Sequence, residues 1–273
     1  METMLQSGDR VTILFLMCTF AFSWILWIIA IFQGTSTAFA MTNILYLTGV
    51  FGPSLSGVLM VLCFYGPFEK RTFFRRIIIV PHNCLPLLGT VMVVIPFMVF
   101  ISRSLSGILG WGNPMAVLLS VLAVSPWNII PILFFILLLG PVSEELGWRG
   151  FFTDSMIQRF NFFTTAALTG LIWGIWHIPL FYIPGSGQNA MGILTLGFWV
   201  FFTTPVVFSF LLLFLYMKTM GSIAAAILVH FSINMSLAVF PLNSGGYGLF
   251  TAFLAVLVAL LYKIHSGNRI EHP

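Results

Sequence analysis

Charged residues are scarce in this chain of 273 residues: Asp, Glu, Lys and Arg together make up 7%, whereas 59% of the residues are hydrophobic. A soluble domain carries roughly 25% charged residues, because it must cover a water-facing surface. The shortage of charge therefore excludes a soluble globular protein and predicts an integral membrane protein. The net charge is only +4, with the basic residues gathered in loops, which argues against nucleic-acid binding.

Cysteine is also rare, with Cys18, Cys63 and Cys84 each lying in or next to an apolar run. They lack the spacing of metal ligands, and an odd number of scattered cysteines argues against a disulfide framework. We interpret them as small buried hydrophobic residues. The sequence has no internal repeat and no low-complexity tract, so we expect a single transmembrane domain over residues 1–273.

Long apolar runs dominate what remains. A helix needs about 20 mainly apolar residues to cross the hydrocarbon core of a bilayer. Runs of this kind occupy residues 11–32, 42–65, 85–101, 117–139, 162–183, 193–217, 222–240 and 249–264. The sequence therefore predicts an all-α, polytopic membrane protein with about eight transmembrane helices in one bundle.

The fourth of these runs needs a shift toward the C-terminus. Pro126 and Pro131 favour a break, followed by a helix from near Pro131 to about Gln158. With a rise of 1.5 Å per residue, this helix would place Glu144 near the middle of the bilayer. Pro141 would then lie inside the helix and should kink it, because proline removes a backbone hydrogen bond.

The distribution of basic residues predicts the orientation. Cytoplasmic loops are enriched in Lys and Arg. We predict that the protein lies in the plasma membrane with both termini in the cytoplasm. In this orientation only Arg103 lies on the outer side of the membrane. The inner side receives Arg10, Lys70, Arg71, Arg75, Arg76, Arg149, Arg159, Lys218, Lys263 and Arg269. Ala38-Phe39-Ala40 resembles a signal-peptide cleavage site, but the first apolar run is too long for one, so we expect it to be retained.

Three polar clusters interrupt the apolar runs. They are Glu144-Glu145 with Arg149, then His177, and then His230 with Asn234. Ionisable groups at membrane depth are costly and rarely face lipid, so each is a candidate for a functional site. Carboxylates, imidazoles and an amide together can activate water.

Spacing separates the roles within the first cluster. Glu145 and Arg149 are four residues apart in the order that favours an ion pair on a helix. Because a buried arginine needs such a partner, this pair would support the site and leave Glu144 free to react. The alternative is a solvated charge cluster at the cytoplasmic end of a helix.

The histidines allow two interpretations as well. His230 and Asn234 share one helical face, where both can donate hydrogen bonds to a single oxygen, as in an oxyanion hole. Polar groups in membrane bundles also serve as plain interhelical hydrogen bonds, and a lone His177 between tryptophans can be a structural residue. Three clusters on three helices that can meet at one depth favour the catalytic interpretation.

At these clusters the chain resembles the family of CAAX proteases and bacteriocin-processing (self-immunity) membrane proteins, in its prokaryotic branch. The resemblance extends from about the fourth apolar run through the seventh, with a catalytic core at about residues 128–240. The first three runs match only in being membrane helices. Trp173 stands where many relatives have phenylalanine. The matching strings are Ser143-Glu144-Glu145-Leu146-Gly147-Trp148-Arg149-Gly150, Gly170-Leu171-Ile172-Trp173-Gly174-Ile175-Trp176-His177 and His230-Phe231-Ser232-Ile233-Asn234.

The resemblance implies an eight-helix bundle with a catalytic cavity open to the cytoplasmic leaflet. In it, Glu144 would activate water with help from His177. His230 and Asn234 would stabilise the oxyanion of the tetrahedral intermediate. Glu145 and Arg149 would maintain the shape of the site. The expected partner is a membrane-associated or lipidated, CAAX-like peptide within the bilayer.

A metal is the main open alternative, because this family was first labelled a metalloprotease. The chain lacks a His-Glu-x-x-His helix, and asparagine is a poor zinc ligand. We therefore expect no required cofactor. If zinc is present, Glu144, His177 and His230 would hold it.

Two other functions remain open at this point. The first is a non-catalytic membrane protein that confers bacteriocin immunity or scaffolds a partner. The second is a transporter, although no matched pair of broken helices supports it. The favoured prediction is an intramembrane endopeptidase.

Overall fold

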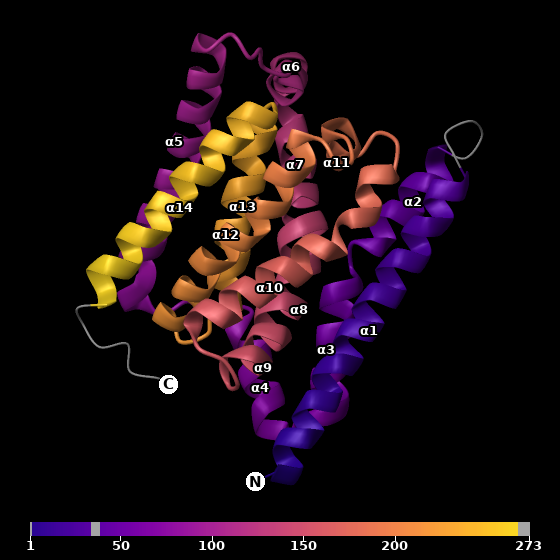
Figure 1. The fold of residues 1–273 in the computed structure, drawn as a ribbon, viewed down its shortest axis with the longest axis vertical. Coiled ribbons are helices and arrows are strands. Elements are labelled where there is room, and N and C mark those ends of the chain that lie inside the picture. The colour runs from indigo at the N-terminus through magenta and orange to yellow at the C-terminus, as the bar shows by residue number, and fades with distance from the viewer. Residues whose placement is uncertain (1, 34–38, 267–273) are drawn as a thin grey trace.

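A computed structural model describes residues 2–33 and 39–266. Within these ranges the chain is helical and contains no strand. Figure 1 shows the helices as one bundle. The α-helices are α1 Glu2–Gln33, α2 Phe39–Gly49, α3 Gly52–Phe64, α4 Pro67–Arg76, α5 Leu85–Ile108, α6 Val117–Val124, α7 Ile129–Leu137, α8 Ser143–Gly147, α9 Thr153–Ile157, α10 Phe162–Trp176, α11 Gly187–Met191, α12 Leu196–Lys218, α13 Ile223–Val239 and α14 Ser244–Ser266.

Seven helical segments of the described chain are long and apolar enough to cross a bilayer. They correspond to seven of the eight predicted runs. The remaining run is α13, an apolar helix of 17 residues, which is at the lower limit for a transmembrane helix. The all-α, polytopic membrane fold predicted from the sequence is therefore confirmed. The seven segments are Asp9–Gln33, Ile44–Phe64, His82–Ile108, Pro126–Ile157, Phe162–Tyr182, Leu196–Lys218 and Ser244–Ile264.

The fourth segment, Pro126–Ile157, confirms the shift argued from the prolines, but its interior differs from a simple proline kink. Pro141 lies in a π-helical turn, Leu138–Val142, and a second π-helical turn spans Trp148–Phe152. Proline has no backbone N–H to donate, and a wider turn fits around this missing donor. Such π turns are frequent at functional sites. The two glutamates lie on α8, between the two π turns.

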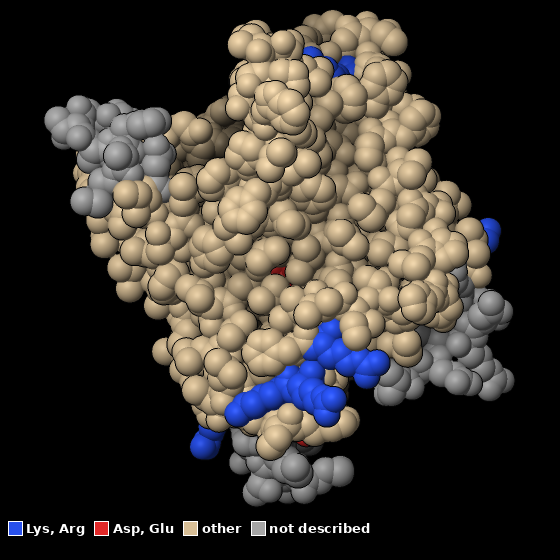
Figure 2. All heavy atoms as spheres, turned by 180° about the vertical axis from the view of Figure 1, so that it is seen from behind, with Lys and Arg blue, Asp and Glu red and all other residues tan. Residues whose placement is uncertain are grey.

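The two ends of the bundle differ in charge. In Figure 1, α4, α9 and the start of α1 lie at one end, whereas α6 and α11 lie at the other. On the face drawn in Figure 2, most of the visible Lys and Arg atoms lie at the end that holds α4 and α9. We call it the basic end; it carries Lys70, Arg71, Arg75 and Arg76 on or beside α4, Arg159 after α9, and Lys218 at the end of α12.

Close backbone contact fixes α8 against α3. A Cβ atom added to Gly147 would lie only 2.1 Å from the carbonyl oxygen of Pro53, and one added to Gly57 would lie 2.7 Å from Cα of Gly147. The Ser54 hydroxyl also donates a hydrogen bond to the carbonyl oxygen of Val142, at 2.8 Å. Small residues allow membrane helices to approach in this way, so α3 holds the helix that carries the glutamates.

The cysteines are only partly as predicted. Cys84 is buried, and its thiol lies 3.0 Å from the carbonyl oxygen of Lys218, to which it donates. Cys18 is half-buried and Cys63 is exposed. The expectation of buried cysteines is therefore right for Cys84 and wrong for Cys63, which lies on the outer surface of α3.

Candidate active site

One cavity of about 270 Å³ collects the candidate residues from three polar clusters. Glu144 from α8, His177 from the end of α10, and His230 with Asn234 from α13 all line it. Glu144, His177 and His230 are buried, and Asn234 is half-buried. Residues that are far apart in the sequence thus face the same space within the bundle.

The Glu144 carboxylate is oriented by a tryptophan. Trp173 on α10 donates a hydrogen bond from Nε1 to Oε2 of Glu144, at 2.6 Å. Glu144 is 6% exposed, so few water molecules can compete for this bond. In the sequence, Trp173 was notable only for standing where many relatives of the resembled family have phenylalanine. Its indole N–H gives it the further task of positioning the carboxylate.

His177 caps the C-terminal end of α10, directly after Trp176. Its Nδ1 lies 2.8 Å from the carbonyl oxygen of Trp173. Because a carbonyl oxygen only accepts, Nδ1 must carry the proton, and the other nitrogen of a neutral ring is then an acceptor. Nε2 of His177 is therefore suited to accept a hydrogen bond from a water molecule.

His230 is held by Glu145. Nδ1 of His230 lies 2.7 Å from Oε1 of Glu145, and the same oxygen accepts a hydrogen bond from Arg149 at 3.1 Å. Arg149 also donates to the Ser209 hydroxyl at 3.1 Å, and its guanidinium lies 4.4 Å from the ring centroid of Trp173. The predicted Glu145–Arg149 ion pair is present, but sequence spacing did not reveal that Glu145 also binds His230.

Asn234 and His230 approach the same glycine. A Cβ atom added to Gly140 would lie 2.5 Å from Nδ2 of Asn234 and 3.8 Å from Nε2 of His230. Gly140 belongs to the π turn that precedes α8, one helical turn before Glu144. The absence of a side chain at Gly140 therefore leaves room beside both potential donors.

Replacing Gly140 by alanine should place a methyl group against the Asn234 amide. We expect kcat to fall by about 10²-fold or more, because losing one oxyanion donor costs roughly 10²–10³-fold. Gly89→Ala is the matched control, since a Cβ there meets nothing within 4 Å. Steady-state kinetics of both variants on one model peptide would test this, and an unchanged kcat for Gly140→Ala would contradict it.

Further residues of the cavity were not predicted from the sequence. Tyr46 on α2, Gln188 on α11, Thr204 on α12 and Tyr247 on α14 also line it. Each is a neutral polar residue outside the three polar clusters, and nothing in the local sequence links it to them. Their common location depends on how the helices pack.

The candidate catalytic side chains include the residue types that bind zinc. Within residues 2–33 and 39–266, no three or more His, Cys, Asp or Glu side chains are grouped so that they could hold a metal ion. Glu144, His177 and His230, the residues expected to bind zinc if it is present, therefore do not form such a group. Nδ1 of each histidine is already engaged, by a carbonyl oxygen and by a carboxylate.

Two known sequences or sequence families match this chain. The sequence model of the Rce1-like type II CAAX prenyl endopeptidase family matches residues 126–236. This range includes all six residues of the three polar clusters. CAAX prenyl protease 2 of Methanococcus maripaludis is 26% identical over 227 residues, which cover 82% of each chain. The chain is therefore similar in sequence to the Rce1-like type II CAAX prenyl endopeptidases over residues 126–236, and to this archaeal protease over most of its length.

Proposed function

We propose that this protein hydrolyses a peptide bond in a membrane-associated or lipidated peptide, with Glu144 as the group that activates water. The observation that carries the proposal is the shared cavity of Glu144, His177, His230 and Asn234 inside an apolar bundle. Membrane proteins rarely retain such groups at this depth without a function. We further propose that the bundle resides in the plasma membrane with both termini in the cytoplasm, as the basic end supports.

The first step is the attack of water on the scissile carbonyl carbon. One Glu144 carboxylate oxygen is fixed by Trp173, so the other can take a proton from the water as the new C–O bond forms. Nε2 of His177 accepts the second hydrogen bond of this water and orients it. A positioned base of this kind contributes about 10²–10⁴-fold to the rate.

The negative charge then gathers on the former carbonyl oxygen. Asn234 donates to this oxygen through its amide. His230 already directs Nδ1 at Glu145, so it donates from Nε2 only as an imidazolium, which the Glu145 carboxylate stabilises. Glu145 therefore has a part in the reaction besides the ion pair with Arg149: it orients the His230 ring so that Nε2 faces the cavity.

Collapse of the tetrahedral intermediate breaks the C–N bond. Glu144 returns the proton to the leaving nitrogen, which departs as an amine while the other fragment keeps a new carboxyl group. The carboxylate is thereby restored for the next cycle. One water molecule is consumed for each peptide bond that is cleaved, so the atoms balance.

This mechanism requires no metal, and chelation tests that point. We expect the purified protein to cleave a model peptide equally well before and after treatment with phenanthroline, since protein groups alone activate the water. A loss of activity that added zinc restores would contradict the metal-free proposal and favour Glu144, His177 and His230 as ligands. Metal analysis of the same sample by mass spectrometry provides the control.

A further inference from the structure

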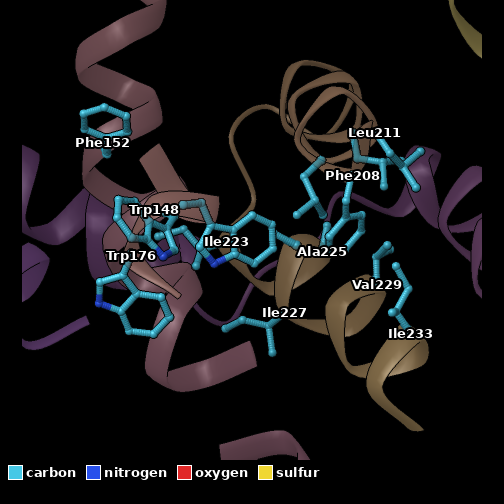
Figure 3. Close-up of a cluster of buried hydrophobic side chains, with 14 of the residues drawn as sticks. Trp148, Phe152, Trp176, Phe208, Leu211, Ile223, Ala225, Ile227, Val229 and Ile233 are labelled. Atoms are coloured by element: carbon cyan, nitrogen blue, oxygen red, sulfur yellow. The ribbon is translucent and has the colours of Figure 1, made fainter. Parts of the chain in front are cut away.

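The cavity is sealed toward the basic end. Along the fourth segment, which runs toward the basic end, Glu144 is followed after one and two helical turns by Trp148 and Phe152, which are 0% and 1% exposed. On α13, which begins at the basic end, Ala226 and Ile223 precede His230 and are 2% and 0% exposed. Figure 3 shows Trp148, Phe152 and Ile223 within one cluster of buried hydrophobic side chains.

The cluster is tightly packed around Gly150 and Trp148. A Cβ atom added to Gly150 would lie 2.7 Å from the Phe73 ring and 2.9 Å from Cδ1 of Ile223. The ring of Trp148 also packs edge-on against Phe152 and Trp176, with centroids 5.9 and 6.2 Å apart. Side chains of α4, α13 and the fourth segment thus close the bundle beneath the candidate site.

Toward the end of the bundle opposite the basic end, the lining of the cavity continues. One turn before Glu144 lies Gly140, and one and two turns after His230 lie Asn234 and Leu237, and all three line the cavity. Further lining residues come from segments at the end opposite the basic end. Gln188 belongs to α11, and Tyr247 lies in the first turn of α14. The candidate site therefore opens away from the basic end.

A second hollow at the basic end is separate. It has a volume of about 640 Å³ and is lined by residues that include Thr72 and Arg76 of α4 and Asp154 of α9. None of the four candidate catalytic residues lines it. Arg76 and Asp154 form an ion pair of 2.6 Å there.

Since Lys and Arg mark the cytoplasmic side of a membrane protein, we infer that the site receives its substrate from the extracytoplasmic half of the bilayer. The substrate is then a membrane-anchored peptide whose cleaved segment is presented from outside the cytoplasm. This inference rests on the proposed function. It reverses the cytoplasmic opening that the family resemblance implies, and it separates the substrate from lipidated proteins of the cytoplasm.

The lining also restricts the chemistry of the cleaved segment. Apart from Glu144 and the two histidines, the residues that line the cavity are uncharged. A charged substrate side chain would remain unpaired there, at a high energetic cost. The volume of about 270 Å³ is at the lower end of ligand pockets. The cavity therefore fits a short, uncharged stretch of peptide.

Cysteine labelling tests the direction of the opening without any need for activity. Gln188→Cys and Thr72→Cys would be treated in intact cells with a membrane-impermeant maleimide, with labelling of the unmodified chain subtracted. We expect Gln188→Cys to react from outside and Thr72→Cys only after permeabilisation. The reverse pattern, equal labelling of both, or an unreactive Gln188→Cys in permeabilised cells would overturn the inference.

Sealed vesicles test the same point through catalysis. A membrane-impermeant, uncharged peptide with a hydrophilic tag should be cleaved by right-side-out vesicles, but by inverted vesicles only after detergent is added. Gln188→Trp should raise KM by narrowing the opening, whereas Thr72→Trp should leave KM unchanged. Cleavage by intact inverted vesicles alone would overturn the inference. A wild-type protein that is inactive even in detergent would instead contradict the proposed function, and the labelling pattern would still decide the direction.

Discussion

Glu144→Gln is expected to abolish peptide hydrolysis while leaving the bundle folded. The amide keeps the size of the side chain and can still accept the hydrogen bond from Trp173, but it cannot take a proton from water. Because general base catalysis contributes about 10²–10⁴-fold, we expect kcat to fall by at least that factor. KM should change little, since the substrate still fits the same cavity.

The measurement is a progress curve on a model peptide in detergent, together with the thermal unfolding midpoint of each protein. Glu69→Gln is the matched control, because Glu69 is an exposed acid on α4, far from the candidate site. If Glu144→Gln no longer cleaves the peptide but keeps its unfolding midpoint, the catalytic role is supported. If the variant also retains the full effect of the protein in cells, the protein acts there as a non-catalytic immunity or scaffold protein.

Arg149→Met should be the most destabilising single change among the charged residues of the site. Arg149 and Glu145 are 1% and 0% exposed, so removing the guanidinium leaves the buried carboxylate without the arginine charge and with the His230 ring as its partner. Breaking a buried ion pair in this way costs about 3–5 kcal/mol. We expect a clear drop in the thermal unfolding midpoint in detergent and a loss of activity, because Glu145 also positions His230.

A double variant separates stability from catalysis. Glu145→Gln combined with Arg149→Met removes both charges, so its unfolding midpoint should lie above that of Arg149→Met alone. Its kcat should remain low, because a neutral amide no longer stabilises an imidazolium at His230. Arg71→Met, on the exposed side of α4, is the control for loss of a surface arginine. An Arg149→Met protein as stable as that control would show that the ion pair is unimportant.

The features that could be predicted from the sequence are those that depend on local spacing. The lengths of the apolar runs predicted the membrane helices, and the positions of the prolines predicted the shifted fourth segment that carries Glu144. The four-residue spacing predicted the ion pair between Glu145 and Arg149. Each of these follows from the geometry of one helix, which is known before any packing is considered.

The features that could not be predicted depend on the rotation of one helix against another. The hydrogen bond from Trp173 to Glu144 links α10 with α8, and the bond between His230 and Glu145 links α13 with α8. Gly140 gained its importance only from its contact with Asn234. The π turn at Pro141 was not predicted, because it is a cooperative property of several residues.

The direction of the cavity shows the same limit. The sequence placed Glu144, His177 and His230 near one depth, and the structure brings them to one cavity. The end of the bundle at which this cavity is closed depends on where bulky side chains from different helices pack together. Phe73 and Ile223 converge on Gly150, and this contact closes the basic end.

The most direct test of the account is the structure of the protein with a hydrated fluoroketone peptide, whose two geminal oxygens mimic the attacking water and the oxyanion. We expect one oxygen within hydrogen-bond distance of Glu144 and the other within reach of His230 and Asn234, with the peptide leaving the cavity on the side of Gln188. A peptide bound away from Glu144, or a metal ion between the carboxylate and the geminal oxygens, would contradict the account.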